Sequence, residues 1–527
     1  MKKLLLIIAV MAITFTQAQV SLVQDFNLGV GDGMPTFDSN RLSFNGNLIF
    51  ATYNGINHGV WIINGSSTLP VLLENFTDST ITPQYFTYSM SNNRVYFTGQ
   101  SDTAGKSSLW QYIGITGSTF EVPSTSIKEI KYITEYQNKV YYQGNTSFGY
   151  ELHYTDASTP GAVYNLNNIG SSSPEELTSI VNDSRLFYSA IANSTSGREL
   201  FMHLSVNNSN TEITINPTGD SNPKDFVTFN NKVYFSADNG TNGRELWVSD
   251  RTIAGTQMIL DLNTGATGSN PENLTVYNNA LYFTATHPTL GTEIFKMNTT
   301  ENITLLNNIA NGGASSSPSD LFVFNNKLYF SADDLINGRE IWTSTGFPST
   351  TSMLKDINTS PATPDSNPNG FTPYYGELFF SANNDTNGRE LWKTDGTTAG
   401  TVLVSDINLS GDSNPEALTV AGDNLYFSAT TPSTGKELFK YIDPSLSVDN
   451  LELKKSILLY PNPTTNNFSI ETNHQIKEVT IYDIQGQFVK TFVNQQDNYS
   501  INDIEAGLYF VNIQTSNSTI SKKLIKK

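Results

Sequence analysis

The sequence predicts an all-β fold: a closed nine-bladed β-propeller followed by a small Ig-like β-sandwich. Three observations lead to this prediction. A segment of about 47 residues recurs along most of the 527-residue chain. Each copy holds four short strand-like runs, which is the content of one propeller blade. Beyond Leu453 the repeat stops and the composition changes. An eight-bladed ring with one irregular module is the alternative arrangement.

The composition supports this fold class and excludes several functions. The chain has 30 Lys and Arg against 49 Asp and Glu, a net charge of −19, which argues against binding to nucleic acid phosphates. Cysteine is absent, so disulfides, thiolate catalysis and Cys-ligated zinc are excluded. Five histidines leave little material for histidine-based acid–base chemistry. The aromatic content of 11% and the low charged fraction of 15% suit short strands joined by polar turns.

The N-terminus has the pattern of a cleaved secretory signal. Met1–Lys3 are positively charged, Leu4–Phe15 are almost wholly apolar, and Thr16–Ala18 end the run with a small residue. The apolar run is shorter than the roughly 20 residues that cross a bilayer as a helix. We therefore expect a signal peptide over residues 1–18 and a mature chain from Gln19. No later apolar run has membrane length, so no transmembrane segment is expected.

The repeat is clearest when its copies are aligned on one aromatic residue. Successive copies of this residue are 45 to 50 positions apart: Phe50, Phe97, Tyr142, Tyr188, Phe235, Phe283, Phe330, Phe380 and Phe427. One copy shows the four predicted strands: Leu274–Tyr277, Leu281–Ala285, Glu293–Met297 and Ile303–Asn307. Four strands in a segment of this length predict a propeller blade, and nine copies predict nine blades over residues 19–442.

The two ends of the repeat region indicate how the ring closes. Leu22–Asn27 matches Leu403–Asn408, which is the fourth strand of a repeat, while the ninth repeat reaches only its third strand at Glu437–Tyr441. The first strand of the mature chain would therefore complete the last blade. Such closure removes two exposed sheet edges, each a template for aggregation.

Tryptophan occupies a single position of the repeat. We expect each ring to pack between adjacent blades, where burial contributes about 2–3 kcal/mol, instead of forming a sugar-stacking platform. The five residues are Trp61, Trp110, Trp247, Trp342 and Trp392, and the other four copies have His153, Phe201, Phe295 and Phe439.

Glutamate recurs two residues before that position in seven copies, and arginine precedes it in four. Glycoside hydrolysis needs two carboxylates flanking one bond, whereas these are spread one per blade. We interpret them as strand-end charges that pair with the neighbouring arginine or cap backbone donors. The residues are Glu151, Glu199, Glu245, Glu293, Glu340, Glu390 and Glu437, with Arg198, Arg244, Arg339 and Arg389.

Two oxygen-rich segments are candidate calcium sites. The candidate ligands are Asp238 and Asn242 in one segment, and Asp385 and Asn387 in the other. The following glutamate comes too soon for a twelve-residue calcium loop, and the Asn-Gly pairs fit tight strand connections equally well. Calcium therefore stays an open possibility, and no other cofactor is expected.

No catalytic residue can be assigned from sequence motifs. The chain lacks a Gly-x-Ser-x-Gly elbow, a P-loop, a His-Glu-x-x-His motif and a Rossmann glycine pattern. Ligand specificity is expected where the repeats differ. Two features differ from the common repeat pattern: the first two copies lack the Arg-Glu pair, and one copy has an insertion near Pro361–Pro368.

The segment Glu390–Thr397 resembles the Glu-Leu-Trp-x-x-Asp-Gly-Thr repeat of secreted bacterial propeller-like proteins. The full form occurs once, and other copies are degraded, as at Ser249–Thr252. This resemblance implies the fold and carries no assigned chemistry.

After a predicted linker at residues 443–455, residues 456–527 form the predicted sandwich of short alternating strands. Its motifs resemble the C-terminal sorting domain of type IX secretion substrates: Tyr460–Thr465, Ile481–Gly486, Ala506–Val511 and Lys522–Lys527. The resemblance implies export across a Gram-negative outer membrane by the type IX machinery, and then release or attachment to the cell surface.

Together these features predict a secreted or cell-surface, non-catalytic binding or adhesion protein with a glycan or protein ligand. The alternative is an extracellular enzyme acting on polysaccharide or glycan from a propeller scaffold. A calcium-stabilised component of a surface layer is a third possibility.

Overall fold

The structure is a computed structural model that describes residues 20–35, 40–65, 69–114, 117–122, 127–156, 162–167, 170–180, 185–192, 197–362, 364–443, 457–472, 474–483, 488–515 and 519–527. It is all-β, built from repeated four-stranded antiparallel sheets. The predicted signal peptide, and all of the predicted linker except Asp443, lie outside the described residues. In the described part of the chain, no helix has the length and apolar character needed to cross a bilayer.

Nine of these sheets lie between Val20 and Tyr441 in the described residues, one for each repeat, and we number them units 1 to 9. The strands of units 1 to 3 are β2 (Arg41–Phe44), β3 (Asn47–Tyr53), β4 (His58–Ile63) and β5 (Val71–Phe76); β6 (Gln84–Ser89), β7 (Arg94–Gln100), β8 (Ser107–Ile113) and β9 (Ser118–Glu121); β10 (Lys128–Tyr136), β11 (Lys139–Thr146), β12 (Gly149–Thr155) and β13 (Ala162–Tyr164).

Units 4 to 6 repeat the same order of strands. They are β14 (Glu175–Ser179), β15 (Arg185–Ile191), β16 (Arg198–Leu204) and β17 (Ser209–Ile213); β18 (Lys224–Phe229), β19 (Lys232–Asp238), β20 (Arg244–Ser249) and β21 (Gln257–Leu260); β22 (Glu272–Tyr277), β23 (Ala280–His287), β24 (Gly291–Met297) and β25 (Ile303–Asn307).

Units 7 to 9 complete the series, and a short 3-10 helix, η2 (Pro348–Thr350), lies between two strands of unit 7. The strands are β26 (Ser319–Phe324), β27 (Lys327–Asp333), β28 (Arg339–Ser344) and β29 (Ser352–Lys355); β30 (Asn369–Tyr374), β31 (Glu377–Asn384), β32 (Gly388–Thr394) and β33 (Val402–Ser405); β34 (Glu416–Ala421), β35 (Asn424–Thr431), β36 (Gly435–Tyr441) and β1 (Val20–Gln24).

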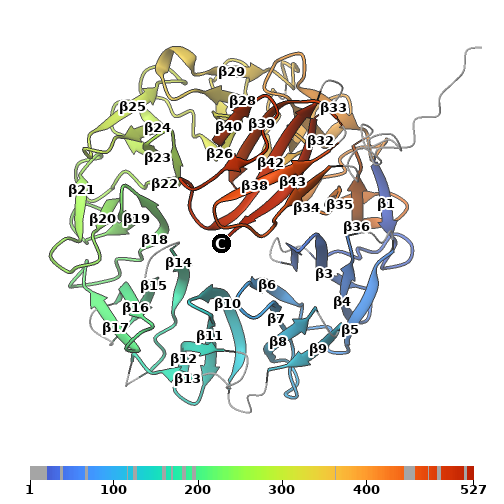
Figure 1. Cartoon of the computed structure of the whole chain (residues 1–527). Helices are drawn as coiled ribbons and strands as arrows, with labels where there is room; N and C mark the ends of the chain where they lie inside the picture. Colours follow the sequence, from blue (N-terminus) through green and yellow to red (C-terminus); the bar gives the residue numbers. More distant parts are fainter. Residues whose placement is uncertain are drawn as a thin grey trace, which may run out of the picture.

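The nine sheets follow one another around a ring, with the first strand of each unit nearest the centre and the fourth near the rim (Figure 1). First strands of neighbouring units contact each other all the way round, including β34 with β2. The N-terminal strand β1 pairs antiparallel with β36, with Val20 opposite Tyr441, as the repeat pattern predicts. The architecture is therefore propeller-like.

The apolar core lies in the seams between neighbouring sheets. Trp342 of unit 7, for example, packs in a cluster with Tyr277 and Tyr282 of unit 6. Trp61 of unit 1 packs against Phe26, which follows β1, and Leu438 of unit 9. Every tryptophan lies in such a seam, since Trp110, Trp247 and Trp392 also join clusters that include residues of the preceding unit.

The C-terminal region contains two further antiparallel sheets. One has the order β37 (Leu458–Tyr460), β38 (Asn467–Glu471), β41 (Tyr499–Ser500), and the other β40 (Phe488–Val493), β39 (Ile476–Asp483), β42 (Gly507–Thr515), β43 (Thr519–Lys526). Both sheets contribute to one core cluster, which includes Phe468 and Tyr499 from the first and Val479 and Val511 from the second. The region is therefore folded around a core of its own.

Candidate functional site

The seven recurring glutamates lie on the third strands and are fully buried, with 0% of their surface exposed. Glu340 is typical: it accepts hydrogen bonds from the Ser366 hydroxyl at 2.6 Å and from the backbone N–H groups of Ile357 at 2.8 Å and Asn358 at 3.3 Å. These donors belong to the segment that leads into the next unit. The interpretation as caps of backbone donors is confirmed, whereas pairing with the preceding arginine is wrong for the described residues.

Burial makes ionisation of these carboxyl groups unfavourable. It raises the pKa of Glu199, Glu340 and Glu437 to about 7, although the hydrogen bonds to each carboxylate act in the opposite direction. The glutamates therefore join units and are unsuited to reach a ligand.

A serine motif that the sequence analysis missed supplies the hydroxyl to this contact. Six glutamates accept from a serine that stands two residues before a proline: Ser172, Ser221, Ser269, Ser316, Ser366 and Ser413. The sequence does contain a pattern that could have revealed this motif, because Ser-(Asn/Ser)-Pro recurs at steps of 47 to 50 residues. The end of the predicted insertion near Pro361–Pro368 is one copy of this motif, so only the residues before Ser366 are extra.

The first strands line the centre of the ring, and in units 2 to 9 each is interrupted by a residue with positive φ next to a shift in strand register. Their φ angles lie between 51° and 71°: Tyr85, Tyr132, Glu176, Asp225, Asn273, Asp320, Gly370 and Ala417. Two residues later the strand pairs regularly again, at Thr87, Thr134, Thr178, Val227, Thr275, Phe322, Thr372 and Thr419.

Five of the six threonines hold this bulge in place. Their hydroxyls donate to the carbonyl of the positive-φ residue at 2.9 to 3.3 Å, as Thr372 does to Gly370 at 3.1 Å. Most bulge residues carry a polar or aromatic side chain at the ring centre. Units 8 and 9 depart from this pattern with Gly370 and Ala417, and unit 7 has Phe322 in place of the threonine.

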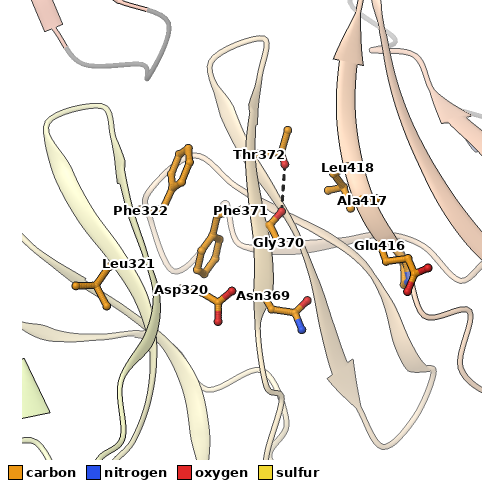
Figure 2. A pocket seen from close by; sticks show the side chains of 11 residues that line it. Asp320, Leu321, Phe322, Asn369, Gly370, Phe371, Thr372, Glu416, Ala417 and Leu418 are labelled. Atoms are coloured by element: carbon orange, nitrogen blue, oxygen red, sulfur yellow. Dashed lines mark hydrogen bonds between the residues drawn. The ribbon is translucent and has the colours of Figure 1, made fainter. Parts of the chain in front are cut away.

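A cavity of about 620 Å³ lies where these departures meet, between β26, β30 and β34. Figure 2 shows the carboxylates of Asp320 and Glu416 and the amide of Asn369 along its lower edge, with the ring of Phe322 above them. Phe371 lines the cavity from a buried position, with 8% of its surface exposed. Carboxylates, an amide and aromatic rings thus surround one space on the first strands of units 7 to 9.

The charges around this cavity are unevenly balanced. Glu416 forms an ion pair with Lys436. Asp320 has no ion-pair partner within the part of the chain that the structure describes. Burial lowers the pKa of the nearby Arg389 guanidinium, and the carboxylates of Asp412 and Asp320 partly offset this effect. The two carboxylates are thus accompanied by the cations of Lys436 and Arg389, and the cavity presents several hydrogen-bond acceptors.

Asp238 is the last residue of β19, and the other predicted calcium ligands lie in the connections between the second and third strands of units 5 and 8. Asp238 accepts the Gly240 N–H at 2.7 Å, and Asn242 donates its amide to Asp261 at 2.6 Å.

In unit 8, Asp385 accepts from the Asn358 amide at 3.2 Å, and Asn387 donates to Asp406 at 2.7 Å. The candidate ligands Asn242 and Asn387 therefore each direct an amide N–H group, not an oxygen, at a neighbouring carboxylate. The described ranges contain no group of three His, Asp or Glu that could hold a metal, and calcium stays a prediction.

Comparison with known proteins bears on the C-terminal region and on the fold. Residues 458–527 match the family model of the secretion system C-terminal sorting domain, which confirms the resemblance found in the sequence. This type IX sorting tail indicates secretion to the cell surface or the extracellular space. No curated protein sequence matches the chain.

Three solved structures show the extent of the structural similarity. One from a study of two prolyl endopeptidases has 12% identity and a TM-score of 0.38, covering 69% of this chain and 55% of that chain. A puromycin hydrolase has 12% identity and a TM-score of 0.35, with 57% and 50% covered. A puromycin-hydrolyzing peptidase of Mycobacterium tuberculosis has 10% identity and a TM-score of 0.36, with 66% and 57% covered. The chain thus spans little more than half the length of these proteins.

Proposed function

We propose that the chain is a secreted or cell-surface, non-catalytic binding or adhesion protein built on a closed nine-bladed β-propeller. In this proposal residues 1–18 are a signal peptide, 19–442 the propeller, 443–455 a linker and 456–527 an Ig-like sorting domain. Nine four-stranded sheets in the described residues, the unbroken circuit of first-strand contacts and the pairing of β1 with β36 support the closed ring.

The cavity on the first strands is the observation that carries the binding function. It lies where three neighbouring units depart from the residues that most other units have, at Phe322, Gly370 and Ala417; unit 5 also departs, at Val227, but lies outside the cavity. Residues that repeat in every unit build the fold, whereas a cavity formed by exceptions has the size and mixed lining of a ligand site. A propeller exported with a sorting tail would present such a site outside the cell.

The alternative is an extracellular glycan-active enzyme that uses the same cavity. Its specific support is the presence of two carboxylates, Asp320 and Glu416, which is the minimum set for most glycoside hydrolases. In the structure the Glu416 carboxylate forms an ion pair with Lys436, so this carboxylate already has a charged partner within the protein. Release of reducing sugar from polysaccharide, abolished in Glu416→Gln, would establish the enzyme and overturn the non-catalytic proposal.

Export is tested by removing the sorting region in the bacterium that makes the protein. A chain ending at residue 443 is expected to lose at least nine-tenths of its extracellular and surface-bound fraction and to accumulate in the periplasm. Immunoblots of medium, surface and periplasmic fractions measure this. Because the C-terminal region has its own core, the truncated ring should keep its melting temperature, and normal export of the truncated chain would contradict the proposal.

Binding is tested with the purified protein on an array of immobilised glycans and extracellular matrix proteins. We expect retention on a defined subset with no product released during prolonged incubation. A protein that retains no probe of either class would contradict the binding function.

A further inference from the structure

Three residue exchanges border the cavity on the first strands, and each differs from the residue type that most other units have at the same position. Gly370 has φ of 71° and Ala417 has φ of 51°, the same backbone conformation as Asn273 at 56° in unit 6. The fold therefore accepts a larger side chain at this position. The absence of one at two neighbouring units leaves the space open between β26 and β34.

Phe322 is the third exchange, and it adds an apolar face. Six of the other seven bulges have threonine at this position, and five of these threonines satisfy the bulge carbonyl. Phe322 lacks a hydroxyl for that contact and instead lines the cavity with its half-buried ring. The ring also packs against the core cluster that contains Phe371, so one of its faces is fixed by the seam while its remaining surface lines the cavity.

The polar groups of the cavity are mainly acceptors. Asp320 and Glu416 contribute carboxylate oxygens, and Asn369 contributes an exposed amide with one acceptor and two donor hydrogens. The charge of Glu416 is balanced by Lys436, so anionic ligands are disfavoured by the Asp320 carboxylate and by the net charge of −19. The complementary ligand carries several hydroxyl donors and an apolar face, and no negative charge.

We propose that this cavity binds a neutral saccharide unit, with its apolar face on Phe322 and its hydroxyls directed to Asp320, Asn369 and Glu416. This inference rests on the proposed binding function and names the ligand class and the specificity-determining residues of that site. Sialylated and uronic acid-containing glycans are excluded from the site by charge.

The test compares exchanges that restore the common repeat pattern. Phe322→Thr introduces the threonine of the other units, and Gly370→Asn introduces the asparagine that unit 6 accepts at the same φ. Val227→Thr is the matched control, since it makes the same kind of restoration in unit 5, outside the cavity. Each purified full-length variant is titrated with the neutral oligosaccharides that the array identifies, and its melting temperature is recorded.

We expect Phe322→Thr and Gly370→Asn to weaken neutral glycan binding at least tenfold while Val227→Thr leaves it unchanged, with all three chains folded. Neutral glycan binding that neither cavity variant affects would overturn the cavity assignment while the binding function stands. Preference for sialylated glycans, or retention of matrix proteins alone, would overturn the ligand class. Retention of nothing would overturn the binding function itself.

Discussion

Phe26→Ala is expected to destabilise the ring by about 3–5 kcal/mol, because it empties the seam where the two ends of the repeat region meet. Phe26 follows β1 of unit 9 and is 7% exposed. Its ring meets Phe50 at 5.6 Å and Trp61 at 5.2 Å between centroids, and both of those residues belong to unit 1. The contact therefore joins the last unit to the first.

Thermal melting and hydrogen exchange measure this effect. Exchange protection should fall first in β36 and β3, the strands on either side of the seam. Leu28→Ala is the matched control, since Leu28 lies two residues away with 88% of its surface exposed, and its removal should change stability by less than about 0.5 kcal/mol. Equal effects of the two exchanges would contradict closure through Phe26.

The architecture was accessible from the sequence because it depends on spacing. Nine aromatic residues at steps of 45 to 50 fix the number of sheets, and the match between Leu22–Asn27 and Leu403–Asn408 predicts that β1 pairs with β36. The location of the tryptophans could also be predicted, because a bulky ring that recurs once per sheet is most simply accommodated between neighbouring sheets. These features are properties of the repeat itself.

The candidate site was not accessible in the same way. Gly370 and Ala417 are small residues without an evident role in the sequence until the register of the first strands shows that they are equivalent to Asp320 of unit 7 and Asn273 of unit 6. The glutamates were predicted correctly as caps of backbone donors, but their complete burial was not accessible, for a related reason. A charged residue at a strand end is usually solvated, and only the return of the next connecting segment over it, seen in the contact of Glu340 with Ser366, shows that it is enclosed.

Glu340→Ala should be among the most damaging single exchanges in the ring. It removes the carboxylate that accepts from the backbone N–H groups of Ile357 and Asn358, and it leaves the Ser366 hydroxyl only its longer contact with the Arg339 carbonyl; Ile357, Asn358 and Ser366 are all buried. Each unsatisfied buried donor costs about 1–3 kcal/mol. Glu340→Gln keeps one accepting oxygen, which can still receive the Ile357 N–H and the Ser366 hydroxyl, but its NH2 group cannot accept from Asn358, so the loss of stability should be smaller than that of Glu340→Ala.

The pH dependence separates these two variants further. The pKa of Glu340 rises to about 7 in the folded chain, above its ordinary value of 4.5, so the folded state keeps a proton that the unfolded state has lost between these pH values. Stability therefore falls as pH increases from about 4.5 to about 7 and levels off above that. The melting temperature of the wild-type chain should accordingly be higher at pH 5 than at pH 8. Glu340→Gln removes one titrating group and should show a smaller decrease over the same interval. A decrease as large as that of the wild-type chain would mean that Glu340 is ionised throughout, held by the N–H donors that face it.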